Sequence, residues 1–506
     1  MFLYVSPQKL VADVPEDHGL DDLALRVGVE NIPTGLGVEV GQVEASDTGG
    51  NYAPDENDKA FPQKTFVLQS GVSGIFNHAT QVGKRVYGNH NVGIAPGVNL
   101  INVYDAEGFL LADYLRSGTS SHPKTPPGDL QLFNNSWIGT FGNAVFDNEV
   151  LRRCDWVIDT HNVTFLNGVA NSGSANPLLG YGFNCISVGK ENGEHVYGPI
   201  PEGYELPGRQ IPLIVASQNT TSNSTGVVSA ATALLIEIQR THPNTVDNFF
   251  ATLSETTKAV LLAGAKHNHD WTNNPIASGS SRGKTTQPMD EVVGAGTVNI
   301  DRSYLIMAGG QHEASTSFSS LVAAPFAGWD TGTLSPGQSK YIRFSVGSVA
   351  DEVAILTTWH QKPNSDFQSY QLVNIDLKFW SLDGEELQSL VGNSGLDIFS
   401  SGNITSESDV DNVEHLYIKG LVPGEYVLEI DRIDSSSGSR VYSVGWLFPE
   451  SQTVPGDLDG DNMVGIEDLL IVISAWGSCP GDCVADINED GVVDVEDLLL
   501  VISYWQ

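Results

Sequence analysis

Thr220-Thr-Ser-Asn-Ser-Thr-Gly-Val-Val-Ser-Ala-Ala-Thr-Ala-Leu-Leu235 is the segment that decides the fold of the first 310 residues, because it joins a hydroxyl cluster to an apolar run of helical period. On both sides of it, strand-like and helical runs alternate. The strands are expected at 37–43, 98–103, 163–166 and 211–215, and the helices at 229–239 and 245–262. Such alternation is typical of an α/β fold with a mainly parallel sheet.

Three polar segments stand where the strands of such a sheet would end. They are Gly37-Val-Glu-Val-Gly-Gln-Val-Glu44, Asn77-His-Ala-Thr-Gln-Val-Gly83 and the hydroxyl cluster that begins at Thr220. Together they offer an acid, a base and a nucleophile. A serine hydroxyl is a poor nucleophile unless an imidazole takes its proton, and the imidazolium then needs a buried carboxylate beside it. We interpret the three segments as parts of one hydrolytic site.

These segments resemble those of the subtilisin-like serine peptidases, whose acid, histidine and serine follow one another in this order. His78-Ala-Thr-Gln-Val-Gly-Lys84 is similar to the family's His-Gly-Thr-His-Val-Ala-Gly, and Gly93-Ile-Ala-Pro-Gly-Val-Asn-Leu100 is similar to the Gly-Val-Ala-Pro stretch that follows it. The resemblance covers roughly residues 19 to 308. It implies a serine endopeptidase with a polypeptide substrate, in which His78 is the base and Ser222 the nucleophile.

The resemblance also assigns an oxyanion donor. Gly168-Val-Ala-Asn171 falls on the family's Ala-Ala-Gly-Asn segment, so Asn171 is expected to donate to the tetrahedral oxyanion. Around the nucleophile the chain departs from the family, because Thr220 stands where the first Gly is usual and Gly226 where Pro is usual. A side chain at Thr220 is expected to crowd the approach of substrate. The alternative interpretation is therefore a catalytically inactive subtilisin-like scaffold that acts as an extracellular binding protein.

Two residues compete for the acid position. Aligning the strand that begins at Gly37 with the family's pattern puts Glu44 there, one methylene longer than the usual Asp. Asp47 heads a literal Asp-Thr-Gly three residues later. We prefer Glu44, because Asp47 would bring Glu44, Ala45 and Ser46 into the buried end of the strand.

In residues 311–449 the sequence pattern changes to that of short strands, with alternating apolar and polar residues and with turn residues between them. Tyr341–Val346, Val373–Phe379 and Gly424–Ile430 each place apolar side chains on one face. The pattern predicts an all-β sandwich of antiparallel strands. Its motif order looks like that of the jelly-roll domains that follow the catalytic domain in secreted bacterial peptidases.

The last fifty residues hold an internal repeat. Asp457–Asp468 recurs 29 residues later as Asp486–Asp497, and each copy leads into a similar apolar tail. Oxygen side chains at positions 1, 3, 5, 9 and 12 are the spacing that wraps a Ca2+ ion. The expected ligands are Asp457, Asp459, Asp461 and Asp468 in the first loop and Asp486, Asn488, Asp490, Asp494 and Asp497 in the second. The first loop is expected to bind more weakly, because Asn462 replaces the turn glycine and Gly465 leaves position 9 to a water.

Residues 455–506 resemble a type I dockerin, a small helical module with two EF-hand-like loops. The resemblance implies Ca2+ as cofactor, a cohesin-domain protein as partner and an extracellular or cell-surface location. Cys479 and Cys483 form an insert between the repeats and are near enough in sequence for a small disulfide, with two free thiols as the alternative. The expected domains are thus 1–310, 311–449 and 457–506, with 450–456 as a linker.

Composition excludes other function classes. The net charge of −37 opposes binding to nucleic acid or to anionic lipid. No run of eighteen apolar residues predicts a membrane span. The first thirteen residues do not resemble a signal peptide, so either the start is truncated or export uses another route.

Overall fold

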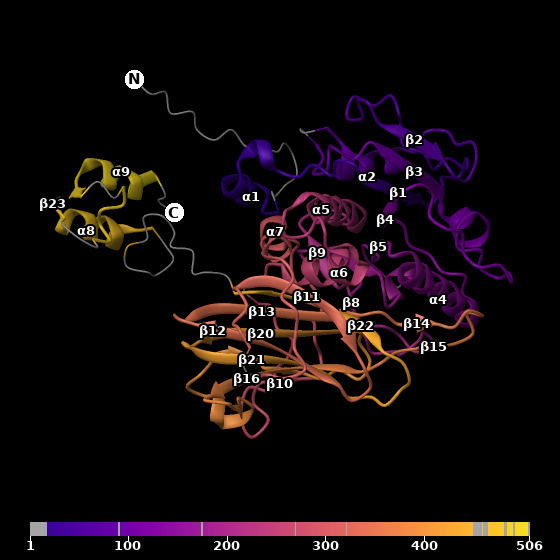
Figure 1. Cartoon of the computed structure of the whole chain (residues 1–506). Coiled ribbons are helices and arrows are strands. Elements are labelled where there is room, and N and C mark those ends of the chain that lie inside the picture. Colours follow the sequence, from indigo (N-terminus) through magenta and orange to yellow (C-terminus); the bar gives the residue numbers. More distant parts are fainter. Residues whose placement is uncertain are drawn as a thin grey trace. The chain divides into compact units, whose positions relative to one another are not determined.

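The computed structural model describes residues 18–89, 92–173, 176–268, 270–319, 321–448, 458, 464–479, 483–488 and 491–503. The chain forms two compact units, Met1–Phe448 and Pro449–Gln506 (Figure 1). The expected α/β and sandwich domains, 1–310 and 311–449, therefore pack together as one compact unit.

A seven-stranded parallel sheet forms the centre of the α/β part, in the order β2-β3-β1-β4-β5-β6-β9. Its strands are β1 (Glu39–Glu44), β2 (Thr65–Leu68), β3 (Leu100–Asp105), β4 (Leu130–Asn135), β5 (Thr164–Gly168), β6 (Ile186–Lys190) and β9 (Ile214–Ala216). The predicted parallel α/β core is confirmed.

Each face of this sheet has its own apolar core, because successive side chains of a strand point to opposite faces. Leu132 packs with α2 and α5 on one face, whereas its neighbour Phe133 packs with α4 on the other. The helices of this part are α1 (Leu20–Val27), α2 (Asn77–Tyr87), α3 (Ala106–Gly108), α4 (Ala144–His161), α5 (Thr221–Thr241), α6 (Ser254–Ala263) and α7 (Ile300–Gly309). Short 3-10 or π turns cover η1 (Val29–Asn31), η2 (Phe109–Asp113), η3 (Leu178–Tyr181) and η4 (Phe249–Thr252).

Two predicted elements differ from the structure. The predicted strand at 211–215 is divided, since Pro212 lacks an N–H for the ladder. Only β9 joins the central sheet, while β8 (Gln210–Ile211) pairs with β7 (Gly198–Pro199). The predicted helix at 245–262 begins only at Ser254, because the Asn248 side chain accepts from Phe250 N and starts the separate turn η4.

Residues 327–447, together with β10 (Lys284–Thr285), form two sheets around one shared core (Figure 1). One sheet has the order β11-β22-β13-β20-β18, and the other β10-β19-β16-β21-β12 with β17 on β16. The strands are β11 (Ala327–Leu334), β12 (Ser339–Val346), β13 (Ala350–Trp359), β16 (Ile375–Asp383), β17 (Glu386–Ser389), β18 (Ser401–Gly402), β19 (Thr405–Ser406), β20 (Val413–Leu421), β21 (Gly424–Arg432) and β22 (Arg440–Leu447), with the hairpin β14 (Lys362–Pro363) and β15 (Tyr370–Gln371) beside them.

The α/β part and the sandwich share elements across the expected boundary at residue 310. β10 (Lys284–Thr285) lies in the predicted α/β range but pairs with β19 of the sandwich. All ten residues of α6 are buried, because this helix packs on the central sheet and also against β13 and β22. The boundary is therefore an extensive packed interface.

The second unit contains helices α8 (Ile466–Ser474) and α9 (Val495–Ser503), with β23 (Gly477–Ser478) paired to β24 (Val492–Val493). Buried Val472 and Val501 bring the two helices into one small core. Cys479 and Cys483 form a disulfide, whereas Cys154 and Cys185 are free and buried.

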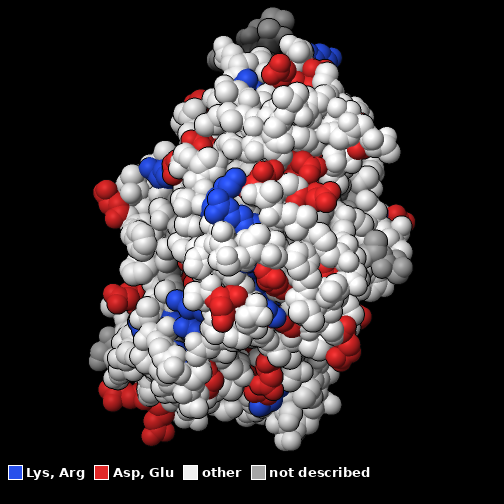
Figure 2. All heavy atoms as spheres, turned by 90° about the vertical axis from the view of Figure 1, so that its right-hand side faces the viewer, with Lys and Arg blue, Asp and Glu red and all other residues white. Residues whose placement is uncertain are grey.

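Surface charge and helix hydrophobicity are the two properties that bear on nucleic-acid and membrane partners. On the face drawn in Figure 2, acidic side chains are scattered among neutral ones, and the described basic side chains form no extended patch. In the part of the chain that the structure describes, no helix has both the length and the apolar character needed to cross a bilayer.

Candidate active site

The predicted site residues converge at the carboxyl ends of the parallel strands. Glu44 ends β1, Asn171 lies three residues beyond β5, and His78 and Ser222 are the second residues of α2 and α5. All four residues border one cleft of about 290 Å3. Crevices beyond the carboxyl ends of strands are the usual position for sites in open α/β sheets.

Glu44 and His78 form the central pair of the cleft. Glu44 Oε2 lies 2.7 Å from His78 Nδ1, and the Glu44 side chain is fully buried. The Glu44 carboxylate raises the pKa of His78 above its ordinary value, because it stabilises the protonated ring more than burial opposes it. The contact at Nδ1 leaves Nε2 as the nitrogen able to exchange a proton in the cleft.

The second oxygen of Glu44 is also held. Gln42 Nε2 donates to Glu44 Oε1 at 2.8 Å and to the Ala79 carbonyl at 2.8 Å. Tyr87 OH donates to Gln42 Oε1. Gln42 and Tyr87 are both buried, so a chain of hydrogen bonds from α2 to β1 fixes the carboxylate.

Asp47, the rival acid, has a different environment. Its carboxylate accepts hydrogen bonds from Gly49 N, Asn51 N and Asn51 Nδ2 in the loop after β1. The hydrogen bonds from Asn51, with that from Gly49 N, hold the pKa of Asp47 below its usual value. Of the two acids, Glu44 is the one in contact with His78.

Ser222 lies in the first turn of α5. Thr220 caps this helix, since its side chain accepts from Asn223 N at 3.2 Å. The Thr220 side chain is thereby used within the helix end and is not among the groups that line the cleft. Ser222 Oγ donates to the Ser136 carbonyl at 3.1 Å. Among the described residues, Ser222 N has no hydrogen-bond acceptor, as expected for a first-turn N–H.

Asn171 is oriented by its own contact with α5. Its Oδ1 accepts from Thr221 N at 2.8 Å, and a backbone N–H can only donate to the oxygen of an amide. The amide orientation is therefore fixed, and Nδ2 is the atom left to donate to a ligand. Asn171 Nδ2 and Ser222 N are thus two N–H donors from residues that line the same cleft.

Gly226, the other departure from the family pattern, has a packing reason. A Cβ at this position would lie 3.1 Å from Arg85 Cβ and 3.4 Å from the Val82 carbonyl oxygen. The small residue lets α5 approach α2 closely. Because α2 carries His78 and α5 carries Ser222, this contact sets the spacing between the two helix ends.

Sequence reasoning missed Gln42, Tyr87 and Ser136. Gln42 had a detectable signal, since it lies two residues before Glu44 and so shares its face of the strand. Tyr87 and Ser136 gave none, because their contacts join elements distant in the sequence.

The predicted calcium ligands lie partly in the described chain. Asp457, Asp459, Asp461 and Asp490 fall outside the described residues. Asp468 and Asp497, at position 12 of the two loops, accept from the backbone N–H groups of equivalent residues. These bonds are Leu458 N to Asp468 Oδ1 (2.6 Å), Gly465 N to Asp468 Oδ2 (2.7 Å), Ile487 N to Asp497 Oδ1 (2.8 Å) and Asp494 N to Asp497 Oδ2 (2.9 Å). The two repeats therefore share one hydrogen-bonding pattern.

No family model and no curated protein matches the chain. Solved structures do. One is the prenylagaramide maturation protease PagA, at 18% identity and TM-score 0.33, over 53% of this chain and 92% of that one. A second is MycP1 from Mycobacterium smegmatis, at 14% identity and TM-score 0.30, over 58% and 86%. A third is tripeptidyl peptidase 2, at 11% identity and TM-score 0.30, over 73% and 40%. Similarities at this level of identity and TM-score concern the fold and say nothing about activity.

Proposed function

We propose that the chain is a serine endopeptidase with a Glu44-His78-Ser222 triad. The observation that carries the proposal is the buried Glu44 carboxylate, 2.7 Å from His78 Nδ1, in the same cleft as a serine at a helix N-terminus. A carboxylate on Nδ1 orients the ring and stabilises the imidazolium that forms during attack. A merely structural histidine would not require a cleft that it shares with a serine.

The residues then have these roles in peptide hydrolysis. Ser222 Oγ bonds to the carbonyl carbon while its proton passes to His78 Nε2. Asn171 Nδ2 and Ser222 N donate to the oxyanion of the tetrahedral intermediate. His78 next gives the proton to the leaving amine as the C–N bond breaks. A water, deprotonated by His78, then bonds to the acyl carbon, and His78 returns the proton to Ser222 Oγ as the ester bond breaks.

A labelling experiment tests this proposal. The purified chain, in calcium, is treated with a fluorophosphonate probe, which reacts with activated serines, and the labelled peptide is mapped. Label on Ser222 that S222A abolishes is the expected result. Ser224, two residues along α5, donates to the Ala216 carbonyl instead, so S224A is the matched control and keeps the label. A folded chain that takes no label contradicts the proposal.

The alternative function is an inactive scaffold that acts as an extracellular binding protein. One observation favours it, the hydrogen bond from Ser222 Oγ to the Ser136 carbonyl. For catalysis this hydroxyl must rotate toward His78, and such contacts often form only in the substrate complex. Absence of label on the folded chain would support the binding protein.

We further propose that Ca2+ binds both loops of the second unit, and that this unit attaches the chain to a cohesin-domain protein outside the cell. The matched backbone contacts of Asp468 and Asp497 support an equivalent loop in each repeat. A cohesin pull-down with and without chelator tests the tether. Capture that requires calcium is expected, and no capture in calcium contradicts it.

A further inference from the structure

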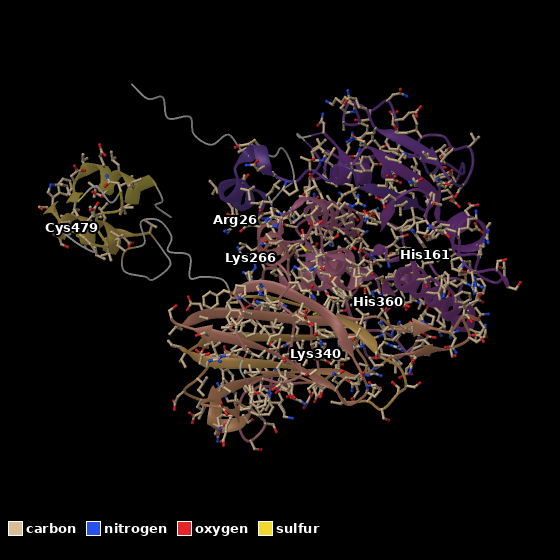
Figure 3. All side chains as sticks on the ribbon, viewed as in Figure 1. Arg26, His161, Lys266, Lys340, His360 and Cys479 are labelled. Atoms are coloured by element: carbon tan, nitrogen blue, oxygen red, sulfur yellow. A yellow bond between two sulfur atoms is a disulfide. The ribbon has the colours of Figure 1, made fainter. Side chains whose placement is uncertain are left out.

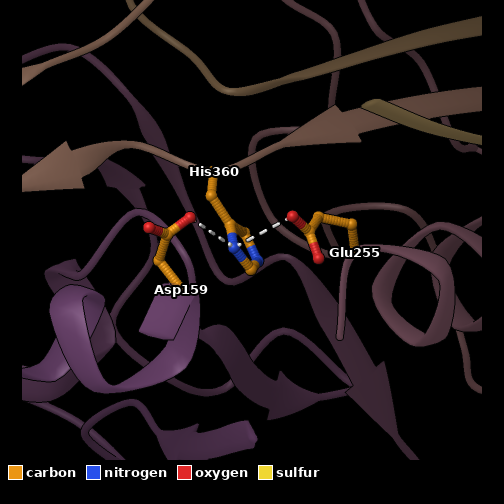
Figure 4. Close-up of side chains that lie close together, drawn as sticks. All are labelled: Asp159, Glu255 and His360. Carbon is orange, nitrogen blue, oxygen red and sulfur yellow. Dashed lines mark ion pairs between the residues drawn. The ribbon is translucent and has the colours of Figure 1, made fainter. Parts of the chain in front are cut away.

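A cluster of three ionisable side chains lies at the interface between the α/β part and the sandwich (Figure 3). Asp159 comes from α4, Glu255 from the first turn of α6, and His360 directly follows β13. Their ligand atoms lie within 4.8 Å of one another. Figure 4 shows the His360 ring between the two carboxylates.

The histidine ring is held so that Nδ1 faces the carboxylates. Ser254 Oγ lies 3.4 Å from His360 Nε2 and is the partner of that nitrogen. His360 is only 3% exposed, yet Nδ1 makes no hydrogen bond in the described chain. A proton on Nε2 leaves a lone pair on Nδ1, the form that a metal requires. An unpartnered buried nitrogen therefore points into a pair of carboxylates.

The distances fit metal coordination better than hydrogen bonding. His360 Nδ1 lies 3.2 Å from Glu255 Oε1 and 3.5 Å from Asp159 Oδ1. A charge-assisted N–H···O bond is about 2.7–2.9 Å long. Ligand atoms at the usual bond lengths of a tetrahedral zinc site lie about 3.3–3.4 Å apart. The two spacings from His360 Nδ1 fall on both sides of this value, and the two carboxylate oxygens lie within 4.8 Å of each other.

Charge also favours a cation here. Among the described side chains, His360 is the one that pairs with the carboxylates of Asp159 and Glu255. Lys362 and Arg440 act on Asp159 only through space. Two carboxylates side by side leave negative charge in a mostly buried place, which costs free energy unless a cation compensates it.

We propose that Asp159, Glu255 and His360 bind one divalent transition-metal ion of the zinc class. The nitrogen ligand and the small number of ligands disfavour Ca2+, which takes six to eight oxygens. Since α4 and α6 belong to the α/β part and His360 to the sandwich, the ion joins the two. The site is separate from the cleft and does not depend on the proposed peptidase function.

The test uses the full chain, freed of metals by a chelator and then saturated with Ca2+ to occupy the oxygen-rich loops. Co2+ is titrated in, and its visible absorption is followed. We expect one equivalent to give the intense bands of four-coordinate Co2+, and Zn2+ to abolish them. The loops cannot produce this signal, because residues 457–506 contain no histidine and oxygen-only sites give weak bands.

Variants show whether the Co2+ absorption bands come from this cluster. H360Q removes the nitrogen ligand and is expected to abolish the bands. E255Q keeps the side-chain shape and is expected to weaken Co2+ binding at least about tenfold. His161 lies two residues from Asp159 on α4 and is not part of the cluster, so H161Q is the matched control and keeps the bands.

Two results would overturn the proposal. One is a folded wild-type chain that gives no intense bands with excess Co2+, which would leave the cluster as an ion pair of protonated His360. The other is a folded E255Q or H360Q chain with the same spectrum and stoichiometry as wild type. A Zn2+-dependent rise of the melting temperature in wild type, absent in E255Q, is the second measurement if H360Q does not fold.

Discussion

Glu44 binds His78 Nδ1 with Oε2 and Gln42 Nε2 with Oε1, so both oxygens of one buried carboxylate are engaged. A glutamate reaches one methylene further than an aspartate and would be free to adopt several rotamers. Gln42 removes that freedom, because it is itself fixed by Tyr87 OH and the Ala79 carbonyl. The longer acid thus has a second support on its own strand.

E44Q is expected to lower kcat/KM about 10^3–10^4-fold, because an amide can no longer hold the imidazole in the right tautomer. The pH profile should change as well. Glu44 raises the pKa of His78 above 6.5, and below that pKa the ring holds the proton and cannot act as base. The acid limb of kcat/KM should lie above pH 6.5 in wild type and move to lower pH in E44Q.

Profiles of kcat/KM against pH for both chains check this. D47N is the control, because Asp47 bonds only within its loop, and its profile should match wild type. An E44Q chain with an unchanged limb would contradict the assignment of Glu44.

N171L and N171D both test Asn171 as a donor to the oxyanion. N171D retains an oxygen that can accept from Thr221 N but loses the Nδ2 donor and adds a negative charge near the oxyanion. We expect kcat to fall about 10^2–10^3-fold or more in both variants, with KM little changed. Steady-state kinetics on a peptide substrate measure this. A loss confined to KM would show that Asn171 binds substrate without serving the transition state.

Y87F is expected to reduce stability, because it leaves Gln42 Oε1 buried without its donor. The cost of such an unsatisfied group is about 1–3 kcal/mol of unfolding free energy. Urea unfolding at fixed pH measures it. The Glu44 orientation also depends on Gln42, so Q42L should lower kcat in addition, whereas a Q42L chain of full activity would contradict a positioning role.

G41A tests the packing of β1, the strand that carries Glu44, against Phe133 of β4. A Cβ on Gly41 of β1 would lie 2.2 Å from Phe133 Cδ1, which is inside the contact distance of two carbons. We expect a loss of about 1–3 kcal/mol of unfolding free energy. Gly347 has nothing within 4 Å of an added Cβ, so G347A is the control and should change stability by less than about 0.5 kcal/mol. A neutral G41A would contradict the tight strand packing.

The local sequence predicted much of the α/β part, since strand-like runs such as that ending at Glu44 alternate with helical runs such as that after Thr220. It did not predict where Pro212 divides a strand or how β10 crosses into the sandwich, because both depend on partners distant in the chain. The proposed metal site could not be predicted from the sequence for the same reason. Asp159, Glu255 and His360 share no spacing or motif and meet only when α4, α6 and β13 pack.

The positions of the proposed triad could be predicted from three short segments, but the residues that support them could not. The sequence suggested that Thr220 would crowd the cleft, whereas the structure uses its hydroxyl as the cap of α5. A threonine at this position can either project into the cleft or cap the helix, and the backbone conformation around it determines which of the two occurs.

The two loops of the second unit should differ in calcium affinity, and removal of Ca2+ should affect that unit alone. Calorimetric titration of the full chain is expected to show two binding events, the tighter at the second loop, which has a glycine at its turn and a carboxylate at position 9. D497A should remove the tighter event and D468A the weaker, because each aspartate holds both ends of its own loop. Residues 18–448 form a compact unit of their own, so their melting transition should not respond to either variant. Equal losses from both variants, or no heat of binding at all, would contradict this account of the repeat.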